Sequence, residues 1–365
     1  MCIFSSFLVD NACGTDYTLL SLLRCLLRHG GCSSVVEPSV VVRVVVGSIP
    51  ISRPILFLFI PIPLNESSLM FMLRGMNKKH DDIDIDTDEL ILAPADCLSK
   101  DILENAHSLN KYDYGHIVIY GGAEKTGAAC LAAMAALRMG CGLVSIVSRA
   151  ESLLVYKSYA PEFMVEHLDE PARFVKHIED ERRSVVLIGP GAGLENRTVL
   201  RKAVMDALRF KDKVTVLDAD ALSVIADDPA PVFKLMHANT ILTPHKGEFD
   251  RLFPQLAGLE PAEAAIEASK LTGAYVVLKT GSIHVGMPDG NIYVSHLGSP
   301  WLATGGTGDV LAGALAGMAG WKAHKDLSAA IIQAVWMYGY TSQMVGKGLI
   351  ASDLLREMQY AWGSL

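Results

Sequence analysis

The residues best suited to chemistry in this sequence form the run Thr304-Gly305-Gly306-Thr307-Gly308-Asp309. Glycines let backbone N–H groups approach a ligand, and a helix that begins near Gly308 would add the positive end of its dipole. Such a turn can stabilise a phosphate or another developing anion. Asp309 would lie in the first helical turn, where its carboxylate can act as a general base toward a hydroxyl. The alternative is an ordinary helix start with a favourable acidic residue.

Two aspartates, Asp218 and Asp220, follow a β-rich run in the segment VLDADAL. Carboxylates at that place can orient a magnesium ion through water or hold a ribose hydroxyl. The alternative is that Asp220 caps a helix that begins near Ala221. The sequence leaves both interpretations open.

Two further segments combine polar or glycine residues with the end of an apolar run. In TPHKGEF we expect His245 and Glu248 to face a cleft, or else Thr243 to cap a helix with Glu248 in its first turn. The run GPGAG, residues 189–193, allows a ligand to approach the backbone, but Leu194 stands where a dinucleotide fingerprint needs its third glycine. The sequence has no G-x-S-x-G elbow, H-E-x-x-H pair or P-loop.

Apolar runs that end in polar or glycine turns alternate with helical segments from about Leu90 onward. The predicted strands are HIVIYGG, LVSIVSR, SVVLIGPGAG, VTVLDADAL, TILTPHKGEF and AYVVLKTG, followed by a hairpin at SIHVGM-PDG-NIYVSH. GAACLAAMAALRMG, the run after TGGTGD and Ser328–Val345 are predicted helices. Ligands of open parallel sheets bind at the carboxyl ends of the strands. The pattern predicts one α/β domain over residues 89–365, with a mostly parallel sheet flanked by helices on both faces.

Composition restricts the class of protein. The chain has 365 residues, of which 50% are hydrophobic and 20% charged, so it can bury a core and is not disordered throughout. The net charge of −8 argues against a nucleic-acid partner. Seven cysteines occur without a C-x-x-C pair. We interpret Cys97, Cys130 and Cys141 as reduced packing residues, which predicts a cytoplasmic protein.

Residues 1–75 differ from the rest of the chain. They hold four cysteines and the apolar run Ile55–Ile60, which prolines flank and which is far shorter than the roughly 20 residues that span a bilayer. No basic region with a small-residue cleavage site marks a secretory signal. Met76 opens a polar stretch that resembles a natural N-terminus. We interpret residues 1–88 as a disordered extension or a start site placed too early, with no membrane partner; the alternative is a targeting or membrane-associated segment.

Taken in order, these motifs resemble the NAD(P)H-hydrate dehydratase family, a branch of the ribokinase-like fold. The resemblance covers about residues 89–365 and is carried by Lys111 with DYGHIVIYGG, GAACLAAMAALRMGCGLV, GPGAG, VLDADAL, LTPHKGEF, VVLKTGS, GSPWLATGGTGDVLAG and LIASDLL. It implies repair of NADH or NADPH to which water has added across the nicotinamide ring. The family transfers a phosphoryl group from ADP or ATP to the ring hydroxyl of the S epimer, and phosphate then leaves.

The resemblance also implies residue roles and partners. Asp309 would be the base, and the anion hole would be formed by Gly305, Gly306, Thr307 and Gly308. The nucleotide would contact Lys279, Thr280, Gly281, Ser282, Ile283 and Gly308. The hydrate would contact Ala128, Gly191, His245 and Asp309. Mg²⁺ would accompany the nucleotide, with metal ligands that the motifs leave unassigned, and the protein would be a homotetramer.

The nucleotide segment departs from the usual pattern of the family. The family reads K-G-x-x-T where this chain has Lys279-Thr280-Gly281-Ser282-Ile283, so a threonine contact is missing or displaced. TPHKGEF together with GGTGD resembles bacterial members, which favours ADP as the donor. Bacterial members are often fused to an epimerase, and residues 1–88 are too short for that domain. We therefore expect no epimerase activity.

Two other functions fit part of the pattern. A ribokinase-like kinase of the thiazole or hydroxymethylpyrimidine type would use the same G-T-G-D logic. Such kinases generally lack LTPHKGEF together with GPGAG. A nucleotide-binding protein without catalytic activity is the third possibility, because the Lys279 segment departs from the pattern.

Overall fold

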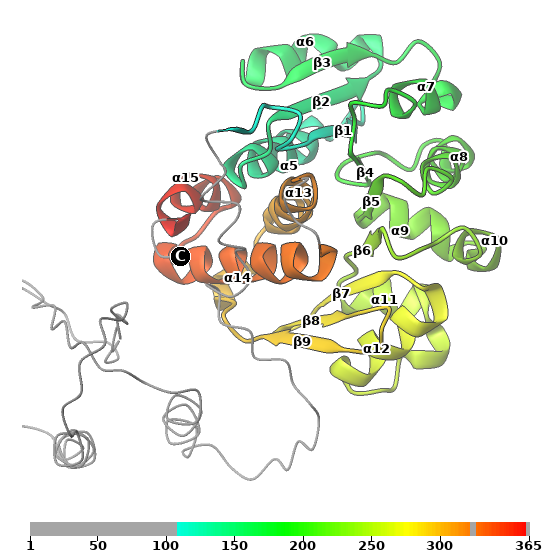
Figure 1. Cartoon of the computed structure of the whole chain (residues 1–365), viewed down its shortest axis with the longest axis vertical. Coiled ribbons are helices and arrows are strands. Elements are labelled where there is room, and N and C mark those ends of the chain that lie inside the picture. Colours follow the sequence, from blue (N-terminus) through cyan, green and yellow to red (C-terminus); the bar gives the residue numbers. More distant parts are fainter. Residues whose placement is uncertain (1–107, 322–325, 363–365) are drawn as a thin grey trace, which may run out of the picture. The chain divides into compact units, whose positions relative to one another are not determined.

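The computed structural model describes residues 108–321 and 326–362, and the expected extension over residues 1–88, with Cys97, lies outside them. The described part contains one nine-stranded sheet in the order β3-β2-β1-β4-β5-β6-β7-β8-β9 (Figure 1). β1 through β7 are parallel, and β8 and β9 add an antiparallel hairpin. The strands are β1 His116–Tyr120, β2 Leu143–Ser148, β3 Met164–His167, β4 Val185–Ile188, β5 Val214–Leu217, β6 Thr240–Leu242, β7 Tyr275–Lys279, β8 Ile283–Gly286 and β9 Ile292–Ser295. The predicted mostly parallel sheet is confirmed.

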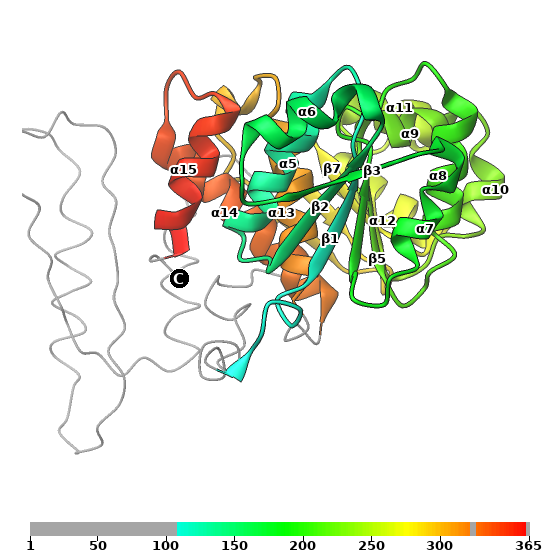
Figure 2. The same cartoon turned by 90° about the horizontal axis from the view of Figure 1, so that it is seen from above.

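Helices cover both faces of this sheet (Figure 1 and Figure 2). One face carries α5 Thr126–Arg138, α13 Thr307–Ala319, α14 Leu327–Val345 and α15 Ala351–Ala361, with α6 Ala150–Tyr159 near the β3 edge. The other face carries α7 Val175–Ile178, α8 Arg197–Ala207, α9 Ala219–Ala226, α10 Pro229–Phe233, α11 Lys246–Leu252 and α12 Pro261–Thr272. Short 3₁₀ turns occur at Pro171–Arg173, Pro254–Leu256 and Pro300–Leu302.

The sheet separates two apolar cores. Ile117 and Ile119 of β1 belong to the core under α5 and α13, whereas Val118 and Tyr120 belong to the core under α8 and α9. Successive side chains of a strand point to opposite faces, so a strand covered on both sides must be apolar throughout. This is why the strand segments are continuous apolar runs rather than alternating ones.

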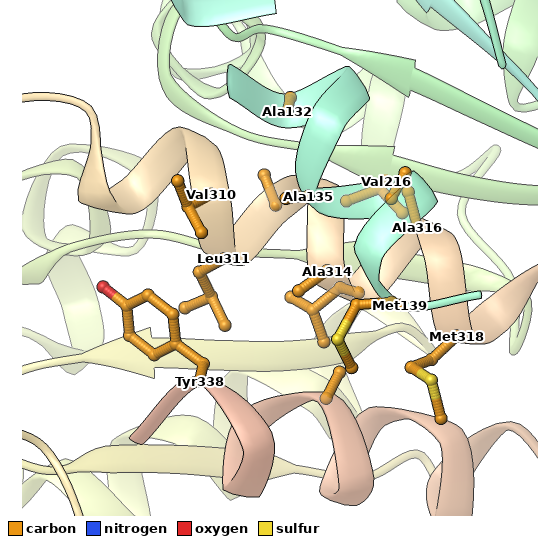
Figure 3. Close-up of a cluster of buried hydrophobic side chains, with 14 of the residues drawn as sticks. Ala132, Ala135, Met139, Val216, Val310, Leu311, Ala314, Ala316, Met318 and Tyr338 are labelled. Atoms are coloured by element: carbon orange, nitrogen blue, oxygen red, sulfur yellow. The ribbon is translucent and has the colours of Figure 1, made fainter. Parts of the chain in front are cut away.

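Helix α13 lies against α5 and α14 on the sheet and is buried on almost every side. Figure 3 shows the alanines and methionines that fill this core, among them Ala132, Ala314 and Met318. The small residues are needed because the two backbones approach closely. A Cβ atom added to Gly313 would lie 2.1 Å from the carbonyl oxygen of Ala132.

We therefore expect Gly313→Ala to lower the free energy of unfolding by about 1–3 kcal/mol, the usual cost of overpacking a core. The methyl group has no room unless α5 and α13 move apart. Gly258→Ala is the matched control, because a Cβ atom at Gly258 would meet nothing within 4 Å. Urea denaturation of both variants measures the difference. Equal stabilities would contradict the close approach of the two helices.

Two other expectations concern cysteines and membranes. Cys130 and Cys141 are free and buried, and burial raises the pKa of their thiols to about 11 and about 12, which fits packing residues. Within residues 108–321 and 326–362, no helix is long and apolar enough to cross a bilayer.

Candidate active site

A cavity of about 550 Å³ opens beside the carboxyl ends of β6 and β7 and the first turn of α13. Three segments that the sequence singled out meet here: the TPHKGEF turn, the Lys279 segment and the glycine-rich turn before α13. The wall of the cavity is formed by His245, Lys279, Thr280, Gly281, Ser282, Ile283, Gly298, Ser299, Pro300, Leu302, Ala303, Thr307, Gly308, Leu311 and Tyr338. All five residues of the expected nucleotide segment lie in this one wall.

Hydrogen bonds from the side chain of Thr307 hold the glycine-rich turn in its conformation. The Thr307 hydroxyl lies 2.7 Å from the carbonyl oxygen of Leu302 and 2.9 Å from that of Thr304, to which it donates. Gly306 has φ +90°, a left-handed conformation that favours glycine, and precedes the first helical residue, Thr307. Thr307 and Gly308 line the cavity, whereas Gly305 and Gly306 lie in the same turn outside its wall. The first turn of α13, where backbone N–H groups lack helical partners and the helix dipole is positive, therefore borders the cavity.

The carboxyl group of Asp309 follows this turn and is partly buried. Burial raises its pKa to about 6, and the nearby charges of Asp218 and Asp220 add to the shift, while Lys279 opposes it. At pH 7 about ten carboxylates are ionised for each that is protonated. Desolvation therefore outweighs the positive helix end, which would by itself lower the pKa. A pKa just below neutral suits a general base. Asp309 itself is not among the residues that line the 550 Å³ cavity.

A buried ion pair joins β5 to β7 behind the cavity. Asp218 is 2% exposed, and its Oδ1 lies 2.9 Å from Lys279 Nζ and 2.5 Å from the donating Thr243 hydroxyl. Lys279 Nζ also lies 3.5 Å from the position that a Cβ atom on Gly308 would occupy. The ammonium group therefore stands between Asp218 and the first turn of α13, where it adds positive charge to the cavity wall.

Asp220 has a different partner from the one expected. Its Oδ2 accepts a hydrogen bond of 2.9 Å from the backbone N–H of Gly193, which ties the GPGAG turn to the start of α9. The prediction that Asp220 caps a helix near Ala221 is wrong. Helix α9 begins at Ala219, its N-cap residue is Asp218, and no side chain caps it. Ala219, between the two aspartates, has φ +44°, a strained conformation for a residue with a Cβ atom.

These partners decide whether the two aspartates suit a magnesium site. Asp218 is already bound by Lys279 and Thr243, and Asp220 by Gly193. Within the described ranges, no group of three or more His, Cys, Asp or Glu side chains could hold a metal ion. The described carboxylates therefore do not form a protein cage for Mg²⁺.

His245 caps a helix and also reaches the cavity. Its Nδ1 accepts hydrogen bonds of 3.0 and 3.3 Å from the backbone N–H groups of Gly247 and Glu248. Glu248 Oε2 in turn accepts one of 2.9 Å from the His245 N–H, which completes a capping box. Glu248 is 9% exposed and does not line the cavity, so the expectation that it faces a cleft is wrong. The expectation that Thr243 caps this helix is also wrong, because the N-cap residue is His245.

The residues expected to contact the hydrate separate into two groups. A Cβ atom on Gly191, whose φ is +60°, would lie 3.0 Å from Cβ of Ala128, so these two residues are neighbours at the start of α5. Neither lines the 550 Å³ cavity. His245 instead lies beside the nucleotide segment, because the Lys279 N–H donates to the carbonyl of Pro244 over 2.8 Å. Its role as a hydrate contact stays a prediction.

Sequence reasoning missed the hydroxyl partners of the nucleotide segment. Thr280 Oγ1 donates to the Ser282 carbonyl over 2.9 Å, so the threonine closes its own turn. Ser282 Oγ lies 2.7 Å from Nδ1 of His296, on the chain that follows β9. Tyr338, in the wall from α14, was also missed. It sits in a continuous apolar helix, where no local pattern distinguishes it from a core residue.

Known proteins are similar to this chain in sequence and in structure. A family model described as NAD(P)H-hydrate dehydratase matches residues 116–358. The ADP-dependent (S)-NAD(P)H-hydrate dehydratase of Lactococcus lactis is 30% identical over 270 residues, which cover 72% of this chain and 94% of that protein. The bifunctional NAD(P)H-hydrate repair enzyme Nnr of Methanopyrus kandleri is 32% identical over 283 residues, 73% of this chain and 53% of that enzyme. The chain thus spans about half the length of such bifunctional relatives.

Solved structures agree with these matches. A ribokinase-like superfamily protein of Enterococcus faecalis covers 73% of this chain and 95% of its own with a TM-score of 0.62 and 24% identity, which shows the fold. The ADP/ATP-dependent NAD(P)H-hydrate dehydratase of Bacillus subtilis, co-crystallised with ATP/Mg²⁺, covers 70% of this chain and 91% of its own, with a TM-score of 0.58 and 26% identity. The ordered motifs, the sheet and the matched residues lead to one conclusion: the chain belongs to the NAD(P)H-hydrate dehydratase family and has its ribokinase-like fold.

Proposed function

We propose that this protein converts the S epimer of NADH or NADPH hydrate back to NADH or NADPH at the expense of ADP or ATP. One observation carries the proposal: a carboxyl group with a pKa of about 6, Asp309, follows a helix-initiating turn that lines a cavity together with the neighbouring Lys279. A base and an anion-stabilising wall are what phosphoryl transfer to a hydroxyl requires. The Lactococcus lactis relative, named for this activity, supports the choice of substrate.

The reaction has two steps, phosphoryl transfer to the ring hydroxyl and elimination of phosphate. Asp309 takes the proton of the ring hydroxyl, whose oxygen attacks the terminal phosphorus of ADP, and AMP leaves. The negative charge that develops on the phosphoryl oxygens is stabilised by the first turn of α13 and by Lys279. The C–O bond then breaks, inorganic phosphate departs with the ring oxygen, and loss of a ring proton restores the double bond. The sum is hydrate plus ADP giving NAD(P)H, AMP, phosphate and a proton.

ADP is the donor we favour, as the motifs of the bacterial type suggest. The Bacillus subtilis relative, co-crystallised with ATP/Mg²⁺, supports a magnesium-bound nucleotide. Because the described carboxylates form no cage, any ion would have to be held mainly by the phosphates of the nucleotide.

Product analysis tests the proposal against the kinase alternative. The purified chain is incubated with the S hydrate and magnesium, with ADP or ATP in parallel. Recovery of the absorbance of the reduced nicotinamide, with equal amounts of phosphate released, is the expected result. Accumulation of a stable phosphorylated alcohol would identify a small-molecule kinase instead.

The pH dependence of kcat/KM should show an acid limb near the pKa of Asp309, about 6, because only its carboxylate form accepts the proton. Activity is then present above this pH and lost as the pH falls through it. Asp220→Asn should move the limb to lower pH, since the Asp220 charge helps to raise this pKa. The amide oxygen of asparagine can still accept the Gly193 N–H.

The comparison of the two pH profiles shows whether the acid limb belongs to Asp309 or to the nucleotide. The terminal phosphate of the nucleotide also titrates near pH 6, but its pKa is the same in both experiments. A limb at the same pH in the wild-type chain and the Asp220→Asn variant would therefore contradict the assignment of the limb to Asp309.

We propose a homotetramer, which only the resemblance supports, and a cytoplasmic location, which the free buried Cys130 and Cys141 support. We also propose that the activity resides in residues 89–365, because the matched residues 116–358 fall within them.

A further inference from the structure

A tyrosine on α14 brings a hydroxyl to the cavity wall that no sequence motif accounts for. Tyr338 is 5% exposed, and its ring packs in the core shared by α5, α13 and α14. Figure 3 shows its side chain extending from α14 toward the first turns of α13, with the oxygen directed away from the labelled alanines and methionines. Tyr338 lines the same cavity as Thr307 and Gly308. Its hydroxyl is therefore the polar end of a side chain that is otherwise held by apolar packing.

The hydrogen bonds of Thr307 make Tyr338 the donor at this wall. The single hydroxyl proton of Thr307 is directed to the carbonyl oxygens of Leu302 and Thr304. Toward Tyr338, with which it interacts, the Thr307 oxygen can then only accept. Turning the tyrosine O–H from Thr307 to a ligand oxygen requires rotation about one bond and leaves the packed ring in place.

The charge of the phenol is also fixed. Burial is the main cause that raises the pKa of Tyr338 well above its usual range, and the nearby Asp218 adds to it. The group therefore stays neutral and protonated at any pH at which the protein would work. A neutral donor that lines the same cavity as the Lys279 ammonium and the first turn of α13 suits an anionic oxygen, because hydrogen bonds to charged acceptors are the strong ones.

We propose that the Tyr338 hydroxyl donates a hydrogen bond to a phosphate oxygen of the nucleotide. It thereby adds a side-chain donor from α14 to the backbone donors of α13 and the Lys279 ammonium. The proposal rests on the proposed function only in taking the ligand of this cavity to be an adenine nucleotide.

Binding measurements on Tyr338→Phe test this role. The variant keeps the ring and removes only the oxygen. Calorimetric titration with ADP should show a Kd about tenfold higher or more than that of the wild-type chain, whereas the Kd for adenosine, which has no phosphate, should stay the same. Tyr275→Phe is the matched control. Tyr275 is 7% exposed, its hydroxyl lies 2.9 Å from Ser328 Oγ, and it does not line the cavity.

The possible outcomes separate this proposal from the proposed function. An unchanged Kd for ADP in Tyr338→Phe, or an equal loss of adenosine binding, would overturn the role of Tyr338. A wild-type chain that binds adenosine as tightly as ADP would overturn it as well. If the wild-type chain discriminates ADP from adenosine but converts no hydrate, the proposed function fails, and the comparison of variants still decides the role of Tyr338. Thermal unfolding of each variant verifies that it is folded.

Discussion

Replacing Asp309 with asparagine is expected to lower kcat by about 10²–10⁴-fold or more, the usual contribution of a positioned base. Asparagine has nearly the same shape, so the turn at Gly306 and the cavity wall should persist. What is lost is the proton acceptor, whose pKa of about 6 keeps it ionised at neutral pH. Because the base acts in the transition state, the loss should appear in kcat at saturating substrate. The Kd for ADP, measured by titration, should change little.

The control for this variant is Asp220→Asn, which makes the same chemical change on a neighbouring carboxylate. Asp220 holds the Gly193 N–H and has no part in the proton transfer, so kcat near neutral pH should be retained. An Asp309→Asn variant with nearly full kcat would refute the mechanism and the assignment of the base.

Lys279→Met should weaken both the nucleotide complex and the fold. Removal of the ammonium should raise the Kd for ADP roughly 10- to 100-fold, the range for a hydrogen bond to a charged group. It also leaves Asp218, 2% exposed, without its cationic partner. We expect the free energy of unfolding to fall by about 3 kcal/mol, the lower end for a broken buried pair, because 20% of the Lys279 side chain is exposed.

Two further variants separate these effects. Asp218→Asn combined with Lys279→Met removes both charges and keeps an acceptor for the Thr243 hydroxyl, so most of the stability should return while ADP affinity stays low. Lys246→Met breaks a surface pair with Asp250 and should cost less than about 1 kcal/mol. Urea denaturation and ADP titration measure all four chains. Recovery of ADP affinity in the double variant would show that Lys279 acts on the fold alone.

The fold could be predicted from the sequence because its main signals are local. The apolar runs had to be strands covered on both faces, and glycine turns marked their ends. The long helix expected at Ser328–Val345 is observed at Leu327–Val345, and the helix expected near Gly308 begins at Thr307. The alanines and glycines of α5 and α13 are visible in the sequence, but the close packing of these two helices on each other was not predicted.

The site was predicted less completely, because its partners are distant along the chain. Asp218 and Lys279 are 61 positions apart, and nothing near either residue indicates that they form a pair. Asp218 and Asp220, which the sequence suggested as magnesium ligands, are thus already bound to Lys279 and to the Gly193 N–H. His245 carries no local sign that it caps its own helix, since histidine is an unusual N-cap residue. Tyr338 reaches the cavity through the packing of α14, which depends on the whole fold.

The most direct test follows the oxygen atom of the ring hydroxyl. NADH hydrate prepared in water labelled with heavy oxygen carries the label in that hydroxyl, and the purified chain converts it with ADP and magnesium. Phosphorylation followed by elimination predicts that the label appears in the inorganic phosphate, one atom for each NADH formed. Recovery of NADH with the label in water, or retention of the label in a phosphorylated nicotinamide that accumulates, would contradict the mechanism.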